Sequence, residues 1–384
     1  MHSTLPNDKD PFKKMVITQD PTWLLNDCDE CSTVGNLAKP FLNDEQLDLI
    51  SLVLISNIQI FNIIGLVGNI LSITVFTKLG FSEPSHISLL ALAASELTCV
   101  VLSIWTNLCF IPDFRDSRLP FHPINISTLT GAGLWAFVVR TVAWITAFIS
   151  FERCLCILAP LKVKRYITSK TTFTAMLLIA ALTICPSFLI YIRWHFVWMF
   201  YPHLNATILD VIPIDNKYYI LLTAIVRFIC GVLQPLLAFA IVVLCTFFLI
   251  IQLRKVSSWR KSVTSGEHQW GQNSEKKPTP NAPGRTTISQ KEERLVRLVV
   301  VIATVFIVCF TPTSLQLLFS SLFEGFFYFG FYRRIYFVVQ LITFLGEAVS
   351  GAVNILIYYN MFSKYRFTLR RLIGLENQEQ ANKK

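Results

Sequence analysis

An acidic residue and a basic residue stand next to each other in the run Glu152-Arg153-Cys154, which directly follows an apolar stretch. Opposite charges at the edge of an apolar segment are costly to keep there and are rarely incidental. Such a pair can close as a local ion pair and open again, and a contact of this kind shifts a two-state equilibrium by a few kcal/mol. The run therefore predicts a conformational switch. The alternative is a solvated cluster of charges at the end of a helix.

Two more arginines, Arg140 and Arg227, stand inside apolar stretches. Arg140 precedes Arg153 by thirteen residues, which is about 20 Å along a helix. A charge at such a depth costs several kcal/mol unless it is paired or hydrated. Guanidinium groups bind a carboxylate, phosphate or sulfate through paired hydrogen bonds, so each arginine is a candidate binding group. The alternative is that Glu347 pairs with one arginine, while the other bonds to Gln234 or to backbone carbonyls.

These charges are set among long apolar blocks. Of the 384 residues, 53% are hydrophobic and only 15% are charged, which is too little polar surface for a soluble protein of this length. The block 49–77 has no charged residue and can cross a hydrocarbon core of about 30 Å. Only helices and closed barrels satisfy the backbone in lipid, and the blocks are too long for barrel strands. The predicted fold is an all-α membrane protein, a seven-transmembrane helix bundle with spans at 49–77, 87–111, 129–152, 171–192, 218–252, 298–321 and 335–359.

The basic residues indicate how this bundle is oriented. With the N-terminus outside, the inner segments hold 21 Lys and Arg residues and the outer segments hold ten, which fits the preference of basic residues for the cytoplasmic side. The net charge of +10 is then a topology signal and gives no support to nucleic-acid binding. In a plasma-membrane protein, we expect 1–48 to be an extracellular tail before an uncleaved anchor, 49–373 the transmembrane domain and 374–384 a short cytoplasmic tail.

Two cytoplasmic segments have a composition of their own. Residues 254–297 are polar, with three prolines near the middle, which predicts a flexible loop. Serine and threonine are frequent in this loop, so phosphorylation there is expected to recruit a regulatory partner. The segment from Met361 to Ile373 mixes aromatic and aliphatic residues with basic ones, which predicts a short amphipathic eighth helix on the anionic lipids of the inner leaflet.

The outer segments contain candidate sites of covalent modification. Asn125 and Asn205 stand in glycosylation sequons, and Asn205, in the middle of a loop, is the better candidate. Seven of the ten cysteines lie in or beside the apolar blocks, where cysteine behaves as a small hydrophobe. Cys109 is placed to pair with Cys28 or Cys31 in the oxidising exterior. The cysteines form no metal-ligand pattern, so no metal site is predicted.

Short motifs recur at characteristic places in the predicted spans. They are Gly68-Asn69, Leu92-Ala93-Ala94-Ser95-Glu96, Glu152-Arg153-Cys154, Pro235, the set Phe306, Cys309, Phe310 and Pro312, and Asn354-Ile355-Leu356-Ile357-Tyr358. In this combination they resemble the motifs of rhodopsin-like (class A) G-protein-coupled receptors, over roughly residues 50–373. Within that family, Gly80-Phe81-Ser82 and Trp144-Ile145-Thr146-Ala147-Phe148 resemble molluscan chemosensory receptors.

The resemblance implies a receptor that binds an extracellular small molecule or peptide and activates a heterotrimeric G protein. In the resting state Glu152 and Glu292 are expected to hold Arg153, and movement of the sixth helix is expected to release it. The switch also includes Phe306, Pro312, Asn354 and Tyr358, with Asn69 and Glu96 as polar residues of the helix core. A receptor kinase and arrestin are the expected partners of the phosphorylated loop. Neither an enzymatic activity nor a cofactor is expected.

By the same resemblance, Arg140 and Arg227 face a cavity between the third and fifth helices and predict a ligand with an anionic group. The cavity wall is expected to be completed by Trp135, Phe310, Ser314, Gln340 and Glu347. In a mixed alternative, Glu347 binds the amine and an arginine the carboxylate of an amino acid or peptide end. A chemosensory ligand is favoured by the local motifs, with a neuropeptide as the alternative. A transporter or channel that uses Glu96 and Glu347 is more remote.

Several positions depart from the family pattern. Receptors of this class usually join a cysteine at the outer end of the third helix to one in the second outer loop. Here Thr128 stands near the first position, and residues 193–217 contain no cysteine. The outer loop must therefore be held in another way or be looser. Val142 and Gly351 replace hydroxyl ligands of the family's sodium site, so we do not predict sodium binding near Glu96.

Overall fold

The computed structural model describes residues 43–115, 117–159, 166–202, 205–214, 216–269, 290–323, 325–326 and 332–374. The chain divides into two compact units, Met1–Leu52 and Val53–Lys384. Of the first unit only residues 43–52 are described, and 44–52 are helical. The arrangement that follows is that of the second unit.

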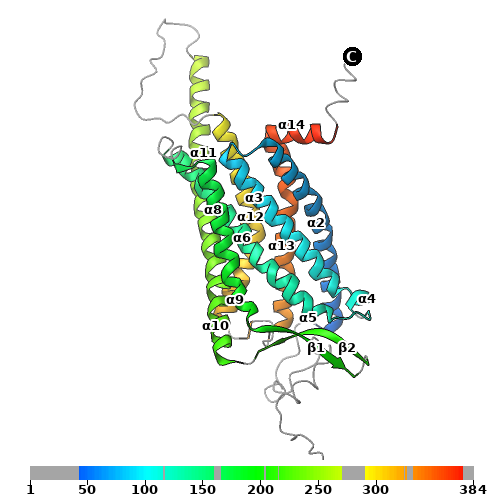
Figure 1. Cartoon of the computed structure of the whole chain (residues 1–384). Coiled ribbons are helices and arrows are strands. Elements are labelled where there is room, and N and C mark those ends of the chain that lie inside the picture. The colour runs from blue at the N-terminus through cyan, green and yellow to red at the C-terminus, as the bar shows by residue number, and fades with distance from the viewer. Residues whose placement is uncertain are drawn as a thin grey trace, which may run out of the picture. The chain divides into compact units, whose positions relative to one another are not determined.

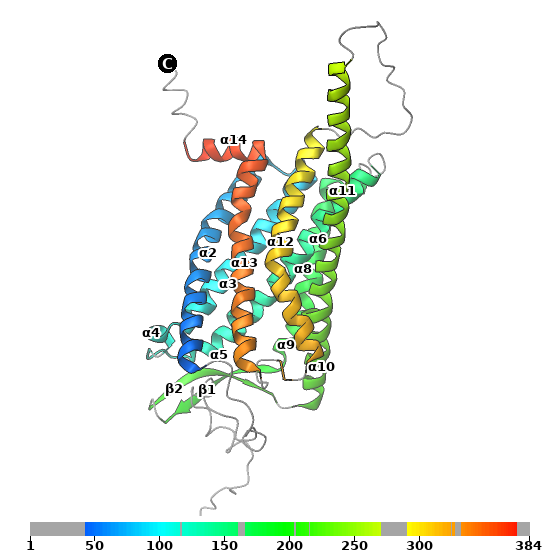
Figure 2. The same cartoon turned by 180° about the vertical axis from the view of Figure 1, so that it is seen from behind.

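Within the described residues, seven helical segments are long and apolar enough to cross a membrane, which confirms the predicted number of spans. They are Glu45–Leu79, Pro84–Phe110, Pro123–Leu158, Ser169–Tyr191, Lys217–Lys255, Glu293–Leu322 and Arg333–Met361. Figures 1 and 2 show the long helices side by side, with a two-stranded hairpin at one end of the bundle and a short helix, α14 (Ser363–Leu372), at the other. We name these the hairpin end and the α14 end.

Four of the spans are single helices, and three are interrupted. The single helices are α2 (Asp44–Leu79), α3 (Pro84–Phe110), α12 (Gln290–Leu322) and α13 (Arg333–Met361). The third span joins α5 (Pro123–Ser127), the π-helix η2 (Thr128–Gly133) and α6 (Leu134–Leu158). The fourth span joins α8 (Ser169–Ile184), the 3₁₀ turn η3 (Cys185–Ser187) and α9 (Phe188–Tyr191). The fifth span joins α10 (Lys217–Phe228), the π-helix η4 (Ile229–Leu233) and α11 (Gln234–Gln269). A single turn, α4 (Pro112–Arg115), follows α3.

The interruption of the fifth span has a local cause. Pro235 has no backbone N–H to donate into the turn before it, and η4 occupies that turn. A π-helix takes one extra residue per turn, so it rotates the side chains before it relative to those after it. The α10 side chains therefore do not point in the directions that a regular α-helix extended back from Pro235 would give them.

The helix α6 is central in the bundle, since it contacts α3, α8, α11 and α12. Apolar side chains fill the interior, whereas many apolar side chains on the outer faces stay exposed, such as Ile60, Ile63 and Val67 of α2. This pattern is the one expected when lipid, rather than water, surrounds the helices.

The helix α14 turns away from the end of α13, as Figure 2 shows. Its Tyr365 and Leu369 are buried against the bundle, and the Tyr365 hydroxyl lies 2.9 Å from Ser72 Oγ of α2. Phe367 is exposed, and Arg370 and Arg371 stand in the last turn. The helix thus has the amphipathic character that the sequence predicted. The predicted flexible loop lies mostly outside the described residues, in 270–289.

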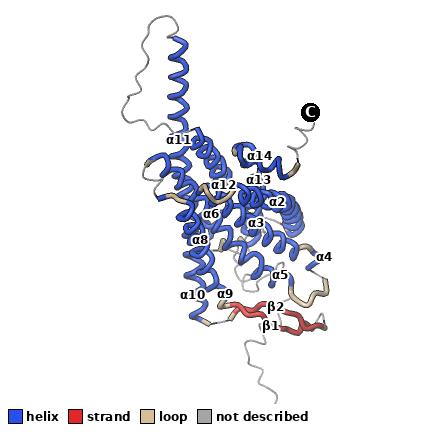
Figure 3. Tube along the Cα trace, turned by 45° about the horizontal axis from the view of Figure 1, so that its top comes forward, coloured by secondary structure: helices blue, strands red, loops and turns tan. Residues whose placement is uncertain are grey.

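The hairpin consists of β1 (Trp194–Tyr201) and β2 (Ala206–Pro213), which pair antiparallel (Figure 3). No strand was predicted from the sequence here. Two runs rich in aromatic and branched residues flank a turn, which is a recognisable strand signal. Asn205, in that turn, adopts a φ of 46°, a left-handed conformation that asparagine tolerates better than most residues.

Candidate functional site

Arg153 and Glu152 lie near the α14 end of α6, where the Arg153 guanidinium donates a hydrogen bond to Glu152 Oε1. The Glu152 side chain is only 1% exposed and that of Arg153 only 9%. The ion pair suggested by the sequence is therefore present and is buried rather than solvated. Removing one partner of such a pair leaves an uncompensated buried charge, at a cost of about 3–5 kcal/mol.

Apolar side chains of α12 cover this pair. Leu295, Leu298 and Val299 line a small cavity together with Glu152 and Arg153. Its volume is about 10 Å³, on a scale where one water needs about 10–15 Å³, so at most one water fits. These side chains of α12 therefore contribute to the burial of the pair.

Glu292, the third residue predicted for the switch, belongs to α12, but its side chain lies outside the described residues. Its neighbour Glu293 is buried and accepts a hydrogen bond from Arg297 Nη2 at 2.5 Å. The described carboxylate of this turn is therefore bound to its own helix. A contact between Glu292 and Arg153 stays a prediction.

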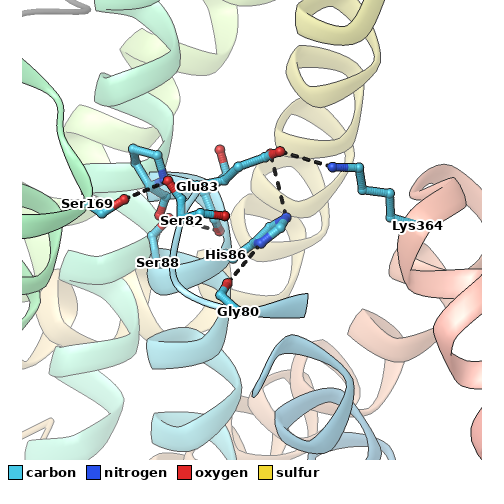
Figure 4. Close-up of polar contacts among 9 residues, drawn as sticks. Gly80, Ser82, Glu83, His86, Ser88, Ser169 and Lys364 are labelled. Atoms are coloured by element: carbon cyan, nitrogen blue, oxygen red, sulfur yellow. Dashed lines mark hydrogen bonds and ion pairs between the residues drawn. The ribbon is translucent and has the colours of Figure 1, made fainter. Parts of the chain in front are cut away.

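A second polar cluster ties the start of α3 to the neighbouring elements at the α14 end (Figure 4). Glu83 Oε1 accepts a hydrogen bond from Lys364 Nζ of α14 at 3.0 Å, and Glu83 Oε2 lies 3.6 Å from Nε2 of the buried His86. The hydroxyl of Ser169, at the start of α8, donates to the carbonyl oxygen of Ser82 at 2.8 Å. These contacts join the start of α3 to α8 and to α14.

The polar residues predicted for the helix core are all buried. Asn354 Nδ2 of α13 donates to Glu96 Oε1 of α3 at 2.5 Å, and this hydrogen bond links the two helices. Tyr358 is fully buried one turn further on, with its ring 5.3 Å from that of Phe76 of α2. Asn69 of α2 is 1% exposed. The four residues thus form part of the bundle interior between the cavity described next and the α14 end.

A cavity in the middle of the bundle is lined by side chains of α2, α3, α6, α12 and α13. Its volume is about 30 Å³, which is room for two or three waters or for one small charged group. Trp135, Phe310 and Glu347, three of the predicted ligand residues, line it, and so does Glu96. Thr313 donates a hydrogen bond to Glu347 Oε1 at 3.0 Å, but the other oxygen of each glutamate is buried without a hydrogen-bond partner in the described part of the chain.

The two arginines predicted to bind an anion are not among the residues that line this cavity. Arg140 is buried, with its guanidinium carbon 4.7 Å from the Phe137 ring centroid, and it lies within electrostatic range of Cys230 in η4. Arg227 of α10 is exposed and lies within electrostatic range of Arg193, which precedes β1. The structure therefore places the two arginines in different surroundings.

Two further residues predicted for the wall, Ser314 and Gln340, also lie outside the cavity lining. Gln340 Oε1 of α13 accepts a hydrogen bond from Gln316 Nε2 of α12 at 2.9 Å. This bond holds the two helices together on the hairpin side of the cavity. Gln340 thus contributes to the position of the cavity wall without forming it.

The aromatic rings of α12 connect the cavity to the deeper interior. Phe310 lines the cavity, and its ring stacks on that of Phe306 with the centroids 4.1 Å apart. Both rings pack against small residues of α6, Ala143 and Ala147. Pro312 stands inside the same helix, where a proline weakens the backbone hydrogen bonding and favours bending. The cavity wall and this proline thus lie on the same stretch of α12.

A family model described as 7 transmembrane receptor (rhodopsin family) matches residues 68–358, which is most of the chain. The chain belongs to the rhodopsin family of seven-transmembrane receptors. It is accordingly a multi-pass membrane protein, and, because the family consists of receptors, it is not an enzyme. No curated protein matches the sequence at a significant level.

This rhodopsin-family receptor holds its hairpin through a buried aspartate instead of the usual disulfide. Asp210, in β2, is 2% exposed. Its carboxylate accepts hydrogen bonds from Asn125 Nδ2 of α5 at 2.8 Å, from the Val211 backbone N–H at 2.7 Å and from the Tyr201 hydroxyl. Burial, and then the neighbouring Asp210, raise the pKa of Tyr201 well above its usual value, so its hydroxyl remains a donor at physiological pH.

Backbone and apolar contacts reinforce this attachment. The Leu209 N–H donates to the Pro120 carbonyl, the His122 N–H donates to the Leu209 carbonyl, and both distances are 2.9 Å. A small apolar cluster lies behind them, formed by Ile126, Leu129 and Val211. The missing cysteines left two alternatives, a looser loop or a loop held by contacts other than a disulfide. The structure has the second, because the contacts of Asp210, Leu209 and the apolar cluster hold this loop.

The candidate modification sites differ in their surroundings. The Asn125 amide is engaged with Asp210, whereas Asn205 is exposed in the hairpin turn. Asn205 therefore stays the better glycosylation candidate of the two. Cys109 is fully buried, and its proposed partners Cys28 and Cys31 lie outside the described residues.

Proposed function

We propose that the chain is a plasma-membrane receptor with its N-terminus and hairpin outside, which binds an external ligand and activates a heterotrimeric G protein. The observation that carries this proposal is the buried pair of Arg153 and Glu152 under the apolar cover of α12. Outward movement of α12 would expose Arg153 to a partner at the α14 end. The larger number of basic residues in the segments at that end supports a cytoplasmic location.

Glu152→Gln is expected to raise ligand-independent G-protein activation severalfold. The amide keeps the size of the carboxylate but lacks the charge that holds Arg153, and a loss of about 1.4 kcal/mol shifts a two-state equilibrium tenfold. The measurement is basal nucleotide exchange by purified G protein at equal receptor density. Glu292→Ala is expected to act in the same direction. Basal exchange that stays at the unchanged receptor's level in both variants would contradict the proposed switch.

For the ligand, the cavity supports a cationic group more than an anionic one. Two glutamates, Glu96 and Glu347, line it with aromatic rings of Trp135 and Phe310, and each keeps a buried oxygen available. An ammonium group satisfies such oxygens and is also attracted by aromatic faces. We therefore propose that Glu347 binds an ammonium group of the ligand. This proposal keeps one half of the mixed alternative, in which Glu347 binds the amine of an amino acid or peptide end.

The biological class of the ligand is proposed from the sequence motifs. They favour a chemosensory ligand, and a neuropeptide is the alternative; both classes include molecules with a free amine. Shut-off by a receptor kinase and arrestin acting on the serine- and threonine-rich cytoplasmic loop is part of the same proposal.

Glu347→Gln is expected to lower the potency of amine agonists by about tenfold to a hundredfold. The loss of a charge-assisted contact in a desolvated site is worth about 1.5–3 kcal/mol, and 1.4 kcal/mol is a factor of ten. The measurement is agonist-stimulated nucleotide exchange with a panel of amino acids, short peptides and simple amines.

The matched controls separate the charge from a general loss of function. N-acetylated forms of the active compounds should be weak on the unchanged receptor and lose little further on the Glu347→Gln receptor. Ser314→Ala, on α12 but outside the cavity lining, should respond as the unchanged receptor does. Full potency of amines on Glu347→Gln would exclude this residue as the ligand's counter-ion.

A further inference from the structure

One edge of the hairpin is available for pairing. Among the described residues the sheet has two strands, so β2 occupies one side of β1 and no strand occupies the other. The far side of β2 is different, because Phe121 bridges to Leu209 there. Natural proteins usually protect a free strand edge with lysine, proline or inward charges. The eight residues of β1, Trp-His-Phe-Val-Trp-Met-Phe-Tyr, contain none of these.

The same strand displays a row of aromatic side chains. Phe196, Trp198 and Phe200 alternate along β1 and therefore stand on one face of it. They are 53%, 63% and 59% exposed. Exposed aromatic residues grouped in this way mark binding surfaces more often than they mark ordinary surface. An unprotected strand edge and an aromatic row thus occur on the same strand.

Positive charge stands at the beginning of this strand. Arg193 directly precedes β1, and its Nε is buried without a hydrogen-bond partner in the part of the chain that is described. Arg227 of α10 lies within electrostatic range of it. Neither guanidinium is in an ion pair with a described carboxylate. Two arginines within electrostatic range of each other suit a carboxylate brought by a partner.

We propose that the receptor binds an extended peptide that adds to β1 as a third strand, with its carboxyl end toward Arg193 and Arg227. The orientation is antiparallel, because these arginines lie at the N-terminal end of β1. Backbone hydrogen bonds along the edge give affinity, and apolar side chains at alternate peptide positions contact Phe196, Trp198 and Phe200. This inference rests on the proposed receptor function and narrows its ligand to a peptide of about eight residues, the length of β1.

The test uses the full chain in nanodiscs and a displayed library of random peptides of about eight residues with free carboxyl ends. Enriched peptides are expected to carry apolar residues at alternate positions. Synthetic copies should bind about tenfold more weakly when one backbone nitrogen on the pairing edge is methylated, or when the carboxyl end is amidated. Trp198→Thr should weaken binding by a similar factor, and Arg193→Gln should remove the effect of amidation. Tyr218→Thr, at an 83% exposed aromatic residue of α10, should have no effect.

Three results would overturn the inference. The first is the absence of enrichment over receptor-free nanodiscs, and the second is equal affinity for the unchanged and Trp198→Thr receptors. The third is binding that appears only after residues 1–42 are deleted, which would assign the edge to the chain's own N-terminal segment. Binding is measured without G protein. Amine agonists that act through Glu347 while no peptide binds the hairpin would therefore refute this inference and leave the receptor function intact.

Discussion

Asp210→Ala is expected to detach the hairpin from the end of α5 and to lower the thermal stability of the receptor. The carboxylate is the common acceptor of three donors, Asn125 Nδ2, the Val211 N–H and the Tyr201 hydroxyl. Asp210 is 2% exposed, so these donors lose their acceptor in a place that bulk water does not reach. A buried donor without an acceptor costs about 1–3 kcal/mol.

The measurement is thermal unfolding of the purified receptor, with limited proteolysis of the hairpin as a local readout. Asp113→Ala is the matched control, since Asp113 is an exposed aspartate in α4 at the same end of the bundle. Asp210→Asn should fall between the two, because the amide keeps one oxygen acceptor but loses the charge. Equal unfolding temperatures and equal proteolysis for Asp210→Ala and Asp113→Ala would show that the aspartate does not hold the hairpin.

The spans could be predicted from the sequence, whereas the hairpin that contains Asp210 was not predicted. The seven spans follow from the length of apolar blocks, which is a local property, and their ends were predicted to within six residues. The two runs and the turn of the hairpin were a recognisable strand signal, but its contacts with α5 join segments far apart in the chain, which no local pattern reports. A single aspartate in the apolar run Ile208-Leu209-Asp210-Val211-Ile212 was an available signal, because a buried carboxylate requires donors.

The positions of the candidate ligand residues were predicted less well, and helix rotation accounts for one of the differences. The family resemblance placed Arg227, eight residues before Pro235, in the cavity. The π-helix η4 lies between the two and rotates α10, so Arg227 is exposed near Arg193 instead. Trp135, Phe310 and Glu347 do line one cavity, whereas Arg140, which shares the regular helix α6 with Trp135, does not.

The switch residues were easier to predict, since Glu152 and Arg153 are adjacent in the chain and their pairing requires no long-range information. What the sequence did not predict is the apolar cover of Leu295, Leu298 and Val299. In the proposed switch, the resting state is therefore stabilised by packing as well as by charge. Its strength then depends on how closely α12 is held against its neighbours, and Gly346 of α13 lies close to the backbone of α12.

Gly346→Ala is expected to destabilise the receptor by about 1–3 kcal/mol through overpacking between α12 and α13. A Cβ at this position would lie 2.5 Å from the Cys309 carbonyl oxygen, which belongs to the backbone of α12. A backbone atom cannot turn aside as the end of a side chain can, so the two helices must separate. The Gln316–Gln340 hydrogen bond joins the same two helices and would be strained by this separation.

Gly351→Ala provides the control within the same helix. A Cβ at Gly351 meets only Glu96 Cβ, at 4.0 Å, which is an ordinary contact. Alanine favours a helix over glycine by about 1 kcal/mol, so both variants gain this contribution and differ in the clash alone. Thermal unfolding should therefore place Gly346→Ala below the unchanged receptor and Gly351→Ala at or above it. If the two variants unfold at the same temperature, the contact between Gly346 and Cys309 does not limit how closely α12 and α13 pack.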